Sequence, residues 1–421
     1  MSRVLLAAVG SLGDLHPMLA VGRALQSVGL QAVIATSPDY APQVAQAGLA
    51  HAPVRPAFDQ MGDRARLARR LFHPLHGPRR LLTEVVLPWL PQAHQDIAAA
   101  AHDCDLLVSH PLSFAVPMVA GQQGKPWLST VLAPASFLSR HDPPRLAGVN
   151  LLQRARERGP LAQRMAWALM RRTLLWWERP LHRYRREHDL PALHEPMLMV
   201  GQFSPQGTLA LFDALLAAPQ PDWPVHTRLC GAPLHDGGEV QRPLPPAVQR
   251  FLEEGEAPLV FALGSSAVWF AQRYWSQVIA AVQQLGRRAL LLTGGQPLPA
   301  LPAGVMAVDY LPYSQVFARA AVVVHQCGIG TLSQALRAGR PQLLTPVAFD
   351  QPDNAQRAAR LGVGPVLPFA QVNASRLVPV LDALLRDADA ARAAAAVAKG
   401  LAGHCGARQA AQAIVSMLHR A

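Results

Sequence analysis

The chain has 421 residues, of which 50% are apolar and 16% are charged. This balance excludes an intrinsically disordered chain, and the length exceeds what one hydrophobic core usually serves, so we expect two domains. The formal net charge of +12 favours an anionic partner, either a lipid surface or a nucleic acid.

Hydropathy and cysteine spacing narrow the class of protein. No apolar run approaches the roughly 18 residues that a membrane-spanning helix needs. The apolar run 4–9 is too short for the core of a signal peptide, and the sequence Gly10-Ser11-Leu12-Gly13-Asp14 after it is not a cleavage site. We therefore expect a cytoplasmic protein. The four cysteines form no CxxC pair, which predicts buried free thiols and neither a zinc site nor a disulfide framework.

The first half of the chain opens with a β-α-β pattern, in which a glycine turn at 10–14 joins a strand to a helix. Strands are predicted where short apolar runs end in turn residues, at 4–9, 31–36, 106–109, 127–132 and 208–212. The segment 137–191 is helical in pattern and rich in arginine. Prolines and glycines then gather at 217–246, and this change of composition predicts a linker.

The second half repeats the same alternation. Further strands are predicted at 259–263, 288–292, 306–308, 321–324 and 342–345, and a final amphipathic helix at 407–418. Strands that alternate with helices form parallel sheets. We therefore predict an α/β fold with two doubly wound, Rossmann-like domains that face each other, with ligands at the carboxyl ends of their strands.

The most informative stretch is 321–354. Its strand ends at His325, a turn with Gly328 and Gly330 follows, and the next helix ends at Gly339. This arrangement places backbone N–H groups and the positive end of a helix where an anion could bind. It therefore predicts a diphosphate site, although the glycines are also compatible with a purely structural turn.

Three motifs carry a resemblance to a known family. They are His325-Gln326-Cys327-Gly328-Ile329-Gly330-Thr331, Asp350-Gln351-Pro352-Asp353-Asn354 and Gly10-Ser11-Leu12-Gly13-Asp14. Together they resemble the donor signature and the first N-terminal loop of the inverting family-1 glycosyltransferases of GT-B fold. Three others, Ser204-Pro205-Gln206-Gly207, Asp222-Trp223-Pro224 and Phe349-Asp350-Gln351, are similar to the rhamnosyltransferase B chain of bacterial glycolipid (rhamnolipid) synthesis.

The resemblance implies a domain order and a donor site. An acceptor-binding domain would cover 1–216, a linker 217–246 and a nucleotide-sugar-binding domain 247–400, with a last helix in 401–421 that packs back on the first domain. The implied contacts are His325, Gly328, Gly330, Thr331, Ser265 and Ser266 for the diphosphate, Asp350 and Gln351 for the sugar, and Tyr310 and Leu311 for the base. Donors at the diphosphate would stabilise the charge that develops as the sugar departs. Capping serines, a solvated turn and a core aromatic are the structural alternatives.

Asp14 is the candidate catalytic base. An inverting transfer needs a group that deprotonates the acceptor hydroxyl as it attacks C1 of the sugar, and it needs no protein nucleophile, metal or cofactor. The resembling family carries His at this position in many members and Asp in others. An ordinary N-cap is the structural alternative for Asp14. His16 and His110 are candidates for the acceptor side, each with a structural alternative.

The positive charge is concentrated in two groups of arginines in the first half of the chain. One group lies within 64–80 and the other within 154–186, where Trp167, Trp176 and Trp177 are interleaved. Basic helices with tryptophan are typical of surfaces that lie on anionic lipid, so we expect peripheral contact with the inner face of the membrane. A plain solvated face and a GC-rich coding bias are the alternatives. No nucleic-acid-binding motif accompanies the charge, so we expect no nucleic acid partner.

These features together predict a glycosyltransferase. It would move a glucose- or rhamnose-like hexose or deoxyhexose from a UDP- or dTDP-sugar, as co-substrate, to a hydroxyl of a lipid or aromatic natural product. The nucleotide and the acceptor class come from the resemblance alone. Two alternatives remain, a nucleotide-sugar epimerase of the same fold and a non-catalytic auxiliary subunit of another glycosyltransferase.

Overall fold

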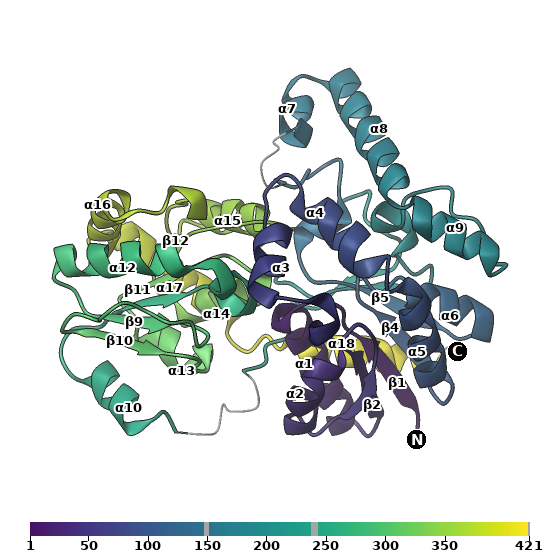
Figure 1. Ribbon diagram of the computed structural model, residues 1–421, viewed down its shortest axis with the longest axis horizontal. Helices are drawn as coiled ribbons and strands as arrows, with labels where there is room; N and C mark the ends of the chain where they lie inside the picture. Colours follow the sequence, from purple (N-terminus) through teal and green to yellow (C-terminus); the bar gives the residue numbers. More distant parts are fainter. Residues whose placement is uncertain (147–150, 237–242, 420–421) are drawn as a thin grey trace. The chain divides into compact units, whose positions relative to one another are not determined.

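The computed structural model describes residues 1–146, 151–236 and 243–419, which form two compact units (Figure 1). Unit 1 comprises Met1–His235 together with Cys405–Ala421, and unit 2 comprises Asp236–His404. Each unit is built on a parallel β-sheet. Parallel strands need crossover connections, and helices supply them here.

The described part of unit 1 contains a seven-stranded sheet in the order β3-β2-β1-β4-β5-β6-β7. Its strands are β1 (Arg3–Ala7), β2 (Gln31–Thr36), β3 (Ala50–Pro53), β4 (Leu106–Ser109), β5 (Trp127–Val131), β6 (Thr208–Ala210) and β7 (Thr227–Leu229). Every residue of β4 and β5 is buried. Strands covered on both faces read as continuous apolar runs, which is why the sequence revealed them.

The helices of unit 1 include the last described helix of the chain. They are α1 (Leu12–Ser27), α2 (Ala41–Gln46), α3 (Arg64–Leu71), α4 (Gly77–Arg80), α5 (Leu90–Ala101), α6 (Ala115–Gln123), α7 (Leu151–Glu157), α8 (Pro160–Trp177), α9 (Arg179–Glu187) and α18 (Gly406–Leu418). α18 packs against α1. A Cβ at Gly406 would lie 2.3 Å from the Gly231 carbonyl oxygen, so α18 enters unit 1 through a contact that only glycine allows.

Unit 2 holds a smaller sheet in the order β10-β9-β8-β11-β12. The strands are β8 (Leu259–Ala262), β9 (Ala289–Leu292), β10 (Val305–Val308), β11 (Val322–His325) and β12 (Gln342–Leu344). The helices are α10 (Pro246–Glu253), α11 (Gly264–Ala267), α12 (Gln272–Leu285), α13 (Tyr313–Val316), α14 (Ile329–Ala338), α15 (Gln351–Arg360), α16 (Ala374–Leu385) and α17 (Ala388–Leu401).

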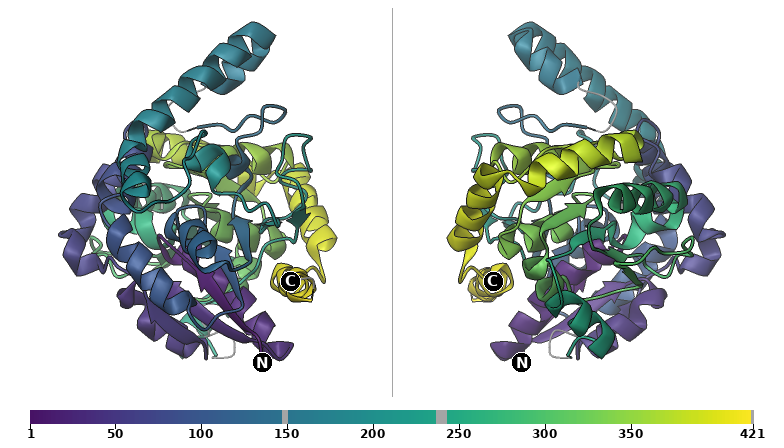
Figure 2. Two further views of the ribbon diagram at one scale, coloured as in Figure 1. Left: turned by 90° about the vertical axis from the view of Figure 1, so that its right-hand side faces the viewer. Right: turned by 90° about the vertical axis from the view of Figure 1, so that its left-hand side faces the viewer.

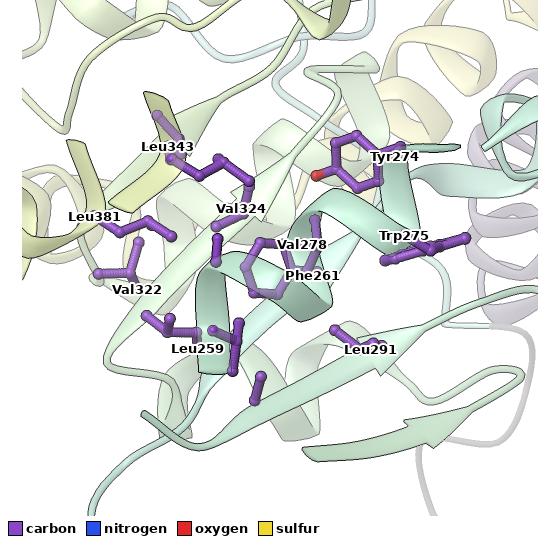
Figure 3. Packing of buried hydrophobic residues seen from close by; sticks show 14 of the residues in the cluster. Leu259, Phe261, Tyr274, Trp275, Val278, Leu291, Val322, Val324, Leu343 and Leu381 are labelled. Atoms are coloured by element: carbon purple, nitrogen blue, oxygen red, sulfur yellow. The ribbon is translucent and has the colours of Figure 1, made fainter. Parts of the chain in front are cut away.

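The core of unit 2 follows the two-residue period of its strands. Leu259 and Phe261 of β8 pack in one cluster with Trp275 of α12 (Figure 3), whereas the alternate residue Val260 packs in a second cluster with Val248 of α10. Successive side chains of a strand point to opposite faces. Apolar residues at every position of β8 therefore require helices on both faces of the sheet.

The structure corrects the predicted linker 217–246. This segment contains β7, so unit 1 extends to His235 and not to residue 216. β7 has three residues between Pro224 and Pro233 and lies at the edge of the sheet. Proline is tolerated at sheet edges, so composition alone concealed the strand. β3, the other edge strand, ends on Pro53 and was missed for the same reason. Residues 237–242 lie outside the described part of the chain.

Among the helices of the described ranges, none combines the length and the apolar character that crossing a membrane requires.

A buried carboxyl group joins α8 to α9. Glu178 is fully buried and accepts hydrogen bonds from the backbone N–H groups of Met197, at 2.6 Å, and Leu198, at 3.1 Å. Burial raises the pKa of Glu178 to about 7, against the lowering effect of these two bonds. In the unfolded chain the group titrates near its ordinary value of 4.5, so the folded chain binds this proton more tightly.

We expect stability to fall as pH rises, because the contribution of Glu178 is fully present below about pH 4.5 and is lost as pH rises through about 7. The loss is on the order of 3 kcal/mol. Urea denaturation should give a lower free energy of unfolding at pH 8 than at pH 5, both for the native chain and for the control Glu187→Gln, which changes an exposed residue of α9. Glu178→Gln should lose most of this pH dependence. An unchanged pH dependence in that variant would contradict the raised pKa of Glu178.

Candidate functional site

The strand order determines which loops are neighbours. In unit 1 the order reverses between β1 and β4, and in unit 2 between β8 and β11. At such a switch point the connections from two adjacent strands depart in opposite directions, which leaves room for a ligand at the carboxyl edge of the sheet. Asp14 and His110 follow β1 and β4, and Ser265 and Gly328 follow β8 and β11. Predicted site residues thus occupy both switch points.

Asp14 lies in the first turn of α1. Its Oδ2 accepts hydrogen bonds from the Ser11 backbone N–H at 2.7 Å and from Ser11 Oγ at 3.1 Å, and Ser11 Oγ accepts from the Gly13 N–H at 3.2 Å. This is a capping box in which Ser11 is the N-cap and Asp14 is the N3 residue, so Asp14 is not the N-cap that was weighed against catalysis, but it does stabilise the start of α1. The side chain nevertheless remains 30% exposed, which leaves the carboxylate accessible to a ligand.

His110 occupies the other oxygen of the Asp14 carboxylate. Its Nε2 lies 3.2 Å from Asp14 Oδ1, and its Nδ1 accepts a hydrogen bond from the Leu112 backbone N–H at 3.2 Å. With Nδ1 as an acceptor, the neutral ring carries its proton on Nε2 and donates it to Asp14. His110 is only 4% exposed. The sequence placed both residues near the acceptor but did not predict this pair.

The loop before Asp14 requires glycine. Gly10 has φ +135°, and a Cβ there would lie 2.2 Å from Asp14 Oδ2. The Tyr40 hydroxyl donates to the Gly10 carbonyl at 3.1 Å. Burial, with Asp14 and Asp39 nearby, raises the pKa of Tyr40, so this donor keeps its proton. Any side chain at position 10 would displace the carboxylate.

His16 lies two residues beyond Asp14 on α1. Its ring meets that of His235 edge to face, with centroids 5.2 Å apart. Burial and the neighbouring His235 lower the pKa of His16 to about 3, so the ring is neutral near pH 7. Contact of His16 with an acceptor stays a prediction.

His325 closes β11 and is fully buried. Its Nε2 lies 3.0 Å from Gln342 Oε1 on the adjacent strand β12, and its Nδ1 accepts from the Cys327 backbone N–H at 3.2 Å. Burial lowers the pKa of His325 to about 4, so the ring is neutral and both nitrogens are occupied. His325 therefore shapes the loop. Its predicted contact with a diphosphate would require the ring to release one of these bonds, and it stays a prediction.

A buried amide connects the β11 loop to α15. Asn354 Nδ2 donates to the Cys327 carbonyl at 3.0 Å and to Asp350 Oδ2 at 2.6 Å. Asn354 is fully buried. The predicted sugar-binding carboxylate and the predicted diphosphate loop are therefore held in one hydrogen-bonded network.

The N-terminus of α14 is open to an anion. Its N-cap is Gly328, no side chain caps it, and its first turn contains no acidic residue, in contrast to α1 with its Ser11–Asp14 box. Gly330 and Thr331 lie in this first turn. Thr331 is 8% exposed, and its hydroxyl bonds to the half-buried Tyr313, whose pKa burial raises to about 12. The backbone N–H groups are thus the donors that this turn could offer to an anion, and binding of a diphosphate there stays a prediction.

The loop after β8 lies against the loop after β11. Gly264 has φ +65°, and a Cβ there would lie 2.2 Å from Gln326 Nε2. Gln326 is 6% exposed, and its Oε1 is buried without a hydrogen-bond partner among the described residues. Ser265 is exposed in α11, whereas the Ser266 side chain lies outside what the structure describes. Contact of either serine with a phosphate stays a prediction.

Gln351 and Tyr310 lie at the ends of the site. Gln351 Oε1 accepts from the backbone N–H groups of Val347 at 2.9 Å and Ala348 at 3.3 Å, so its amide nitrogen is the group suited to a sugar hydroxyl. Tyr310, after β10, is 43% exposed, as a ring that stacks on a base must be. Leu311 is 3% exposed and belongs to the core. Only its backbone could therefore contact the base of a nucleotide.

Over the described ranges, no three His, Cys, Asp or Glu side chains are grouped so as to hold a metal ion. That the reaction needs neither metal nor cofactor stays a prediction.

Sequence reasoning assigned no role to Gln342 or Asn354. Both are fully buried polar residues beside the loop, and buried polar groups need partners. The signal was present in the sequence, since Gln342 opens a predicted strand and Asn354 closes the Asp350-Gln351-Pro352-Asp353-Asn354 motif. Their partners come from other segments and needed the fold.

Comparison with known proteins places these features in a family. A family model described as erythromycin biosynthesis protein CIII-like, C-terminal domain, matches residues 282–417. The chain is 31% identical to the O-mycaminosyltylonolide 6-deoxyallosyltransferase of Streptomyces fradiae, over 89% of this chain and 88% of the relative. It is 30% identical to the vancomycin aglycone glucosyltransferase of Amycolatopsis orientalis, over 86% and 85%.

Solved structures agree on the fold. The glycosyltransferase of kitacinnamycin has a TM-score of 0.72 at 20% identity and covers 99% of this chain and 98% of its own. The glycosyltransferase VinC, solved with dTDP, has a TM-score of 0.67 at 20% identity and covers 100% of both. The predicted α/β fold class, with two Rossmann-like parallel-sheet domains of GT-B type, is confirmed. The closer likeness to the rhamnosyltransferase B chain stays a prediction.

The backbone conformation of Cys327 allows the geometry of the loop after β11 to be tested. Its φ of 66° lies in the left-handed region, which costs a residue with a side chain about 1–3 kcal/mol. Alanine and glycine both remove the thiol, but only glycine removes this strain. We expect Cys327→Gly to be more stable than Cys327→Ala by about 1 kcal/mol in urea denaturation.

Cys104, which is buried and not among the residues of positive φ, is the matched control. At position 104 the alanine variant should be the more stable of the two. An alanine at position 327 that matched or exceeded glycine would contradict the loop geometry.

Proposed function

Because this chain belongs to the family of GT-B glycosyltransferases, we propose that it transfers a hexose or deoxyhexose from a nucleoside diphosphate to a hydroxyl of a natural-product acceptor, with inversion at C1. Unit 2 binds the donor, and unit 1 supplies the base. The observation that carries the proposal is the Asp14 carboxylate, part-exposed at the switch point of unit 1 and held by Ser11 and His110.

The chemistry assigned to Asp14 is a single displacement. Asp14 removes the proton of the acceptor hydroxyl as that oxygen forms its bond to C1 of the sugar. The bond from C1 to the diphosphate oxygen breaks, and the diphosphate leaves with the electron pair. Attack opposite the leaving group inverts C1. Asp14 then holds the proton and releases it to solvent when the product departs.

His110 is the positioning residue of this step. Its Nε2–H bond to Asp14 Oδ1 and the Ser11 bonds to Oδ2 orient the carboxylate. The Leu112 N–H holds His110 in the tautomer that can donate. A base kept in one orientation loses little entropy when the reaction begins.

The leaving group is assigned to the loop after β11. The uncapped N-terminus of α14 points backbone N–H groups at Gly328 and Gly330 toward a bound anion. Such fixed donors stabilise charge more strongly as it develops on the diphosphate than before the sugar departs. Asp350 and Gln351 supply an acceptor and a donor for sugar hydroxyls, and the exposed Tyr310 ring supplies a stacking face for the base.

The relatives suggest the substrates. The S. fradiae enzyme is named for O-mycaminosyltylonolide and the A. orientalis enzyme for the vancomycin aglycone, and VinC was solved in complex with dTDP. We assign to this chain a dTDP- or UDP-sugar and an apolar natural-product acceptor. Incubation of the enzyme with a panel of such donors and aglycones, followed by mass spectrometry, tests this. A donor changed to another free nucleotide sugar without any acceptor would instead show an epimerase, and binding without turnover an auxiliary subunit.

Asp14→Asn keeps the shape of the side chain but cannot take a proton. We expect kcat to fall by about 10²- to 10⁴-fold, while stabilisation of the chain by dTDP in a thermal shift stays unchanged. Nucleoside diphosphate release in the presence of acceptor measures the turnover.

Asp63→Asn is the matched control. Asp63 caps α3 through the Arg66 N–H at 2.5 Å, so its variant loses a carboxylate cap and no proposed base. It should retain full turnover. If Asp14→Asn also retained it, Asp14 would be only a cap and the catalytic assignment would fail.

Substitutions at the residues assigned to the donor should affect the affinity for the nucleotide and for the nucleotide sugar differently. Tyr310→Ala should weaken binding of dTDP and of a dTDP-sugar alike by about fivefold, since both share the base and a lost aromatic stack costs about 1 kcal/mol. Asp350→Asn should weaken only the dTDP-sugar, by about tenfold or more. Titration calorimetry measures each, with Tyr310→Phe as the control that keeps the ring. Equal losses in Asp350→Asn for dTDP and its sugar would remove Asp350 from the sugar site.

A further inference from the structure

One face of α8 exposes large apolar side chains to solvent. They are Leu161, at 72% exposed, Met165, at 65%, Leu169, at 57%, and Trp176, at 48%, and we call them the α8 face. Their spacings of four, four and seven residues put them on one side of a helix. The opposite side of α8 is occupied, because Ala166 and Trp167 pack with Leu152 of α7. The α8 face is thus not the core side of the helix.

α7 and α8 stand away from the sheet of unit 1. Both views show them extending beyond the other helices of that unit (Figure 2). Scattered exposed apolar residues are ordinary on a protein surface, but a continuous row of four on a projecting helix is not. Nothing in the described part of unit 1 covers this row.

The charge around the row has one sign. Six arginines and a single acidic residue, Glu157, lie between residues 151 and 177. Arg164 and Arg172 are exposed on the same side of α8 as the row, since they lie three residues from Leu161 and Leu169. Arg171 forms an ion pair with Glu195 at 2.7 Å. The arginines beside the row therefore keep an excess of positive charge.

The two arginine groups of the sequence meet at this row. Arg79 of α4, in the first group, places its Cζ 4.9 Å from the centre of the Trp176 ring, in the second. Arg79 is itself exposed, and Leu75, four residues earlier, is 53% exposed. The basic surface thus continues from α8 onto α4. A tryptophan with an arginine over its ring combines an apolar body with a cationic partner.

We propose that the α8 face docks on an anionic lipid surface. Its apolar row would enter the boundary between headgroups and acyl chains, while the arginines bind the lipid phosphates. Charge complementarity favours this occupant over a second copy of the chain, because a copy would bring the same excess of arginines to the contact. Docking would place the enzyme where apolar acceptors accumulate. It does not depend on the sugar chemistry, so either proposal can fail without the other.

Co-sedimentation of the full chain with vesicles tests the proposal. Vesicles of phosphatidylglycerol and phosphatidylcholine should bind the native chain, more weakly at high salt, and vesicles of phosphatidylcholine alone should bind it less. Leu161→Glu with Leu169→Glu should lower the bound fraction by roughly tenfold or more. Arg164→Gln and Arg172→Gln should each weaken binding by about fivefold.

Matched controls come from exposed positions elsewhere on unit 1. Val225→Glu changes an apolar residue that is 74% exposed, and Arg408→Gln removes an exposed arginine of α18. Both should bind like the native chain. If the α8 variants bound vesicles as well as the native chain does, the proposal would be overturned. It would also be overturned if the native chain showed no preference for anionic vesicles. If the α8 variants instead dissociated a dimer in sedimentation velocity with vesicle binding unchanged, the face would be an interface between copies and the lipid assignment would be wrong.

Discussion

The buried imidazole of His325 is the constraint on which the conformation of the loop after β11 depends. Its two ring nitrogens join the end of β11 to β12 through Gln342 and to the turn through Cys327. Asn354 then links that turn to Asp350 at the start of α15. Because His325, Gln342, Cys327 and Asn354 are buried, breaking one of these bonds leaves a buried polar atom without a partner, which costs more than the bond itself contributes. The N-terminus of α14 and the Asp350 carboxylate are therefore held in place without a ligand.

The strand order of unit 1 also reverses at a switch point. The loops after β1 and β4 carry Asp14 and His110 there, and the His110 imidazole is hydrogen-bonded to the Asp14 carboxylate. Asp14 is also the N3 residue of the capping box of α1, so one side chain stabilises the fold and is assigned the chemistry. Gly10 permits both by leaving room for Oδ2.

The fold was largely readable from the sequence, because the central strands of both sheets are buried on two faces and appear as apolar runs. The edge strands β3 and β7 were not, since edges accept proline and polar residues. Motif resemblance and position at strand ends singled out Asp14, His110 and the glycines of the loop after β11 as candidate site residues. The partners of these residues could not be read, because the Asp14–His110 bond joins residues 96 positions apart and the His325–Gln342 bond joins adjacent strands. His325 is fully buried, with both ring nitrogens hydrogen-bonded within the protein. A sequence motif does not show whether a residue is buried.

Asp14 is proposed to act as a base in one displacement, with no intermediate bonded to the protein. The anomeric configuration of the sugar in the product, determined by NMR against that of the donor, tests this most directly. A product inverted at C1 is the predicted result. A product that retained the donor configuration would require two displacements, or a front-side attack, and would contradict the role given to Asp14.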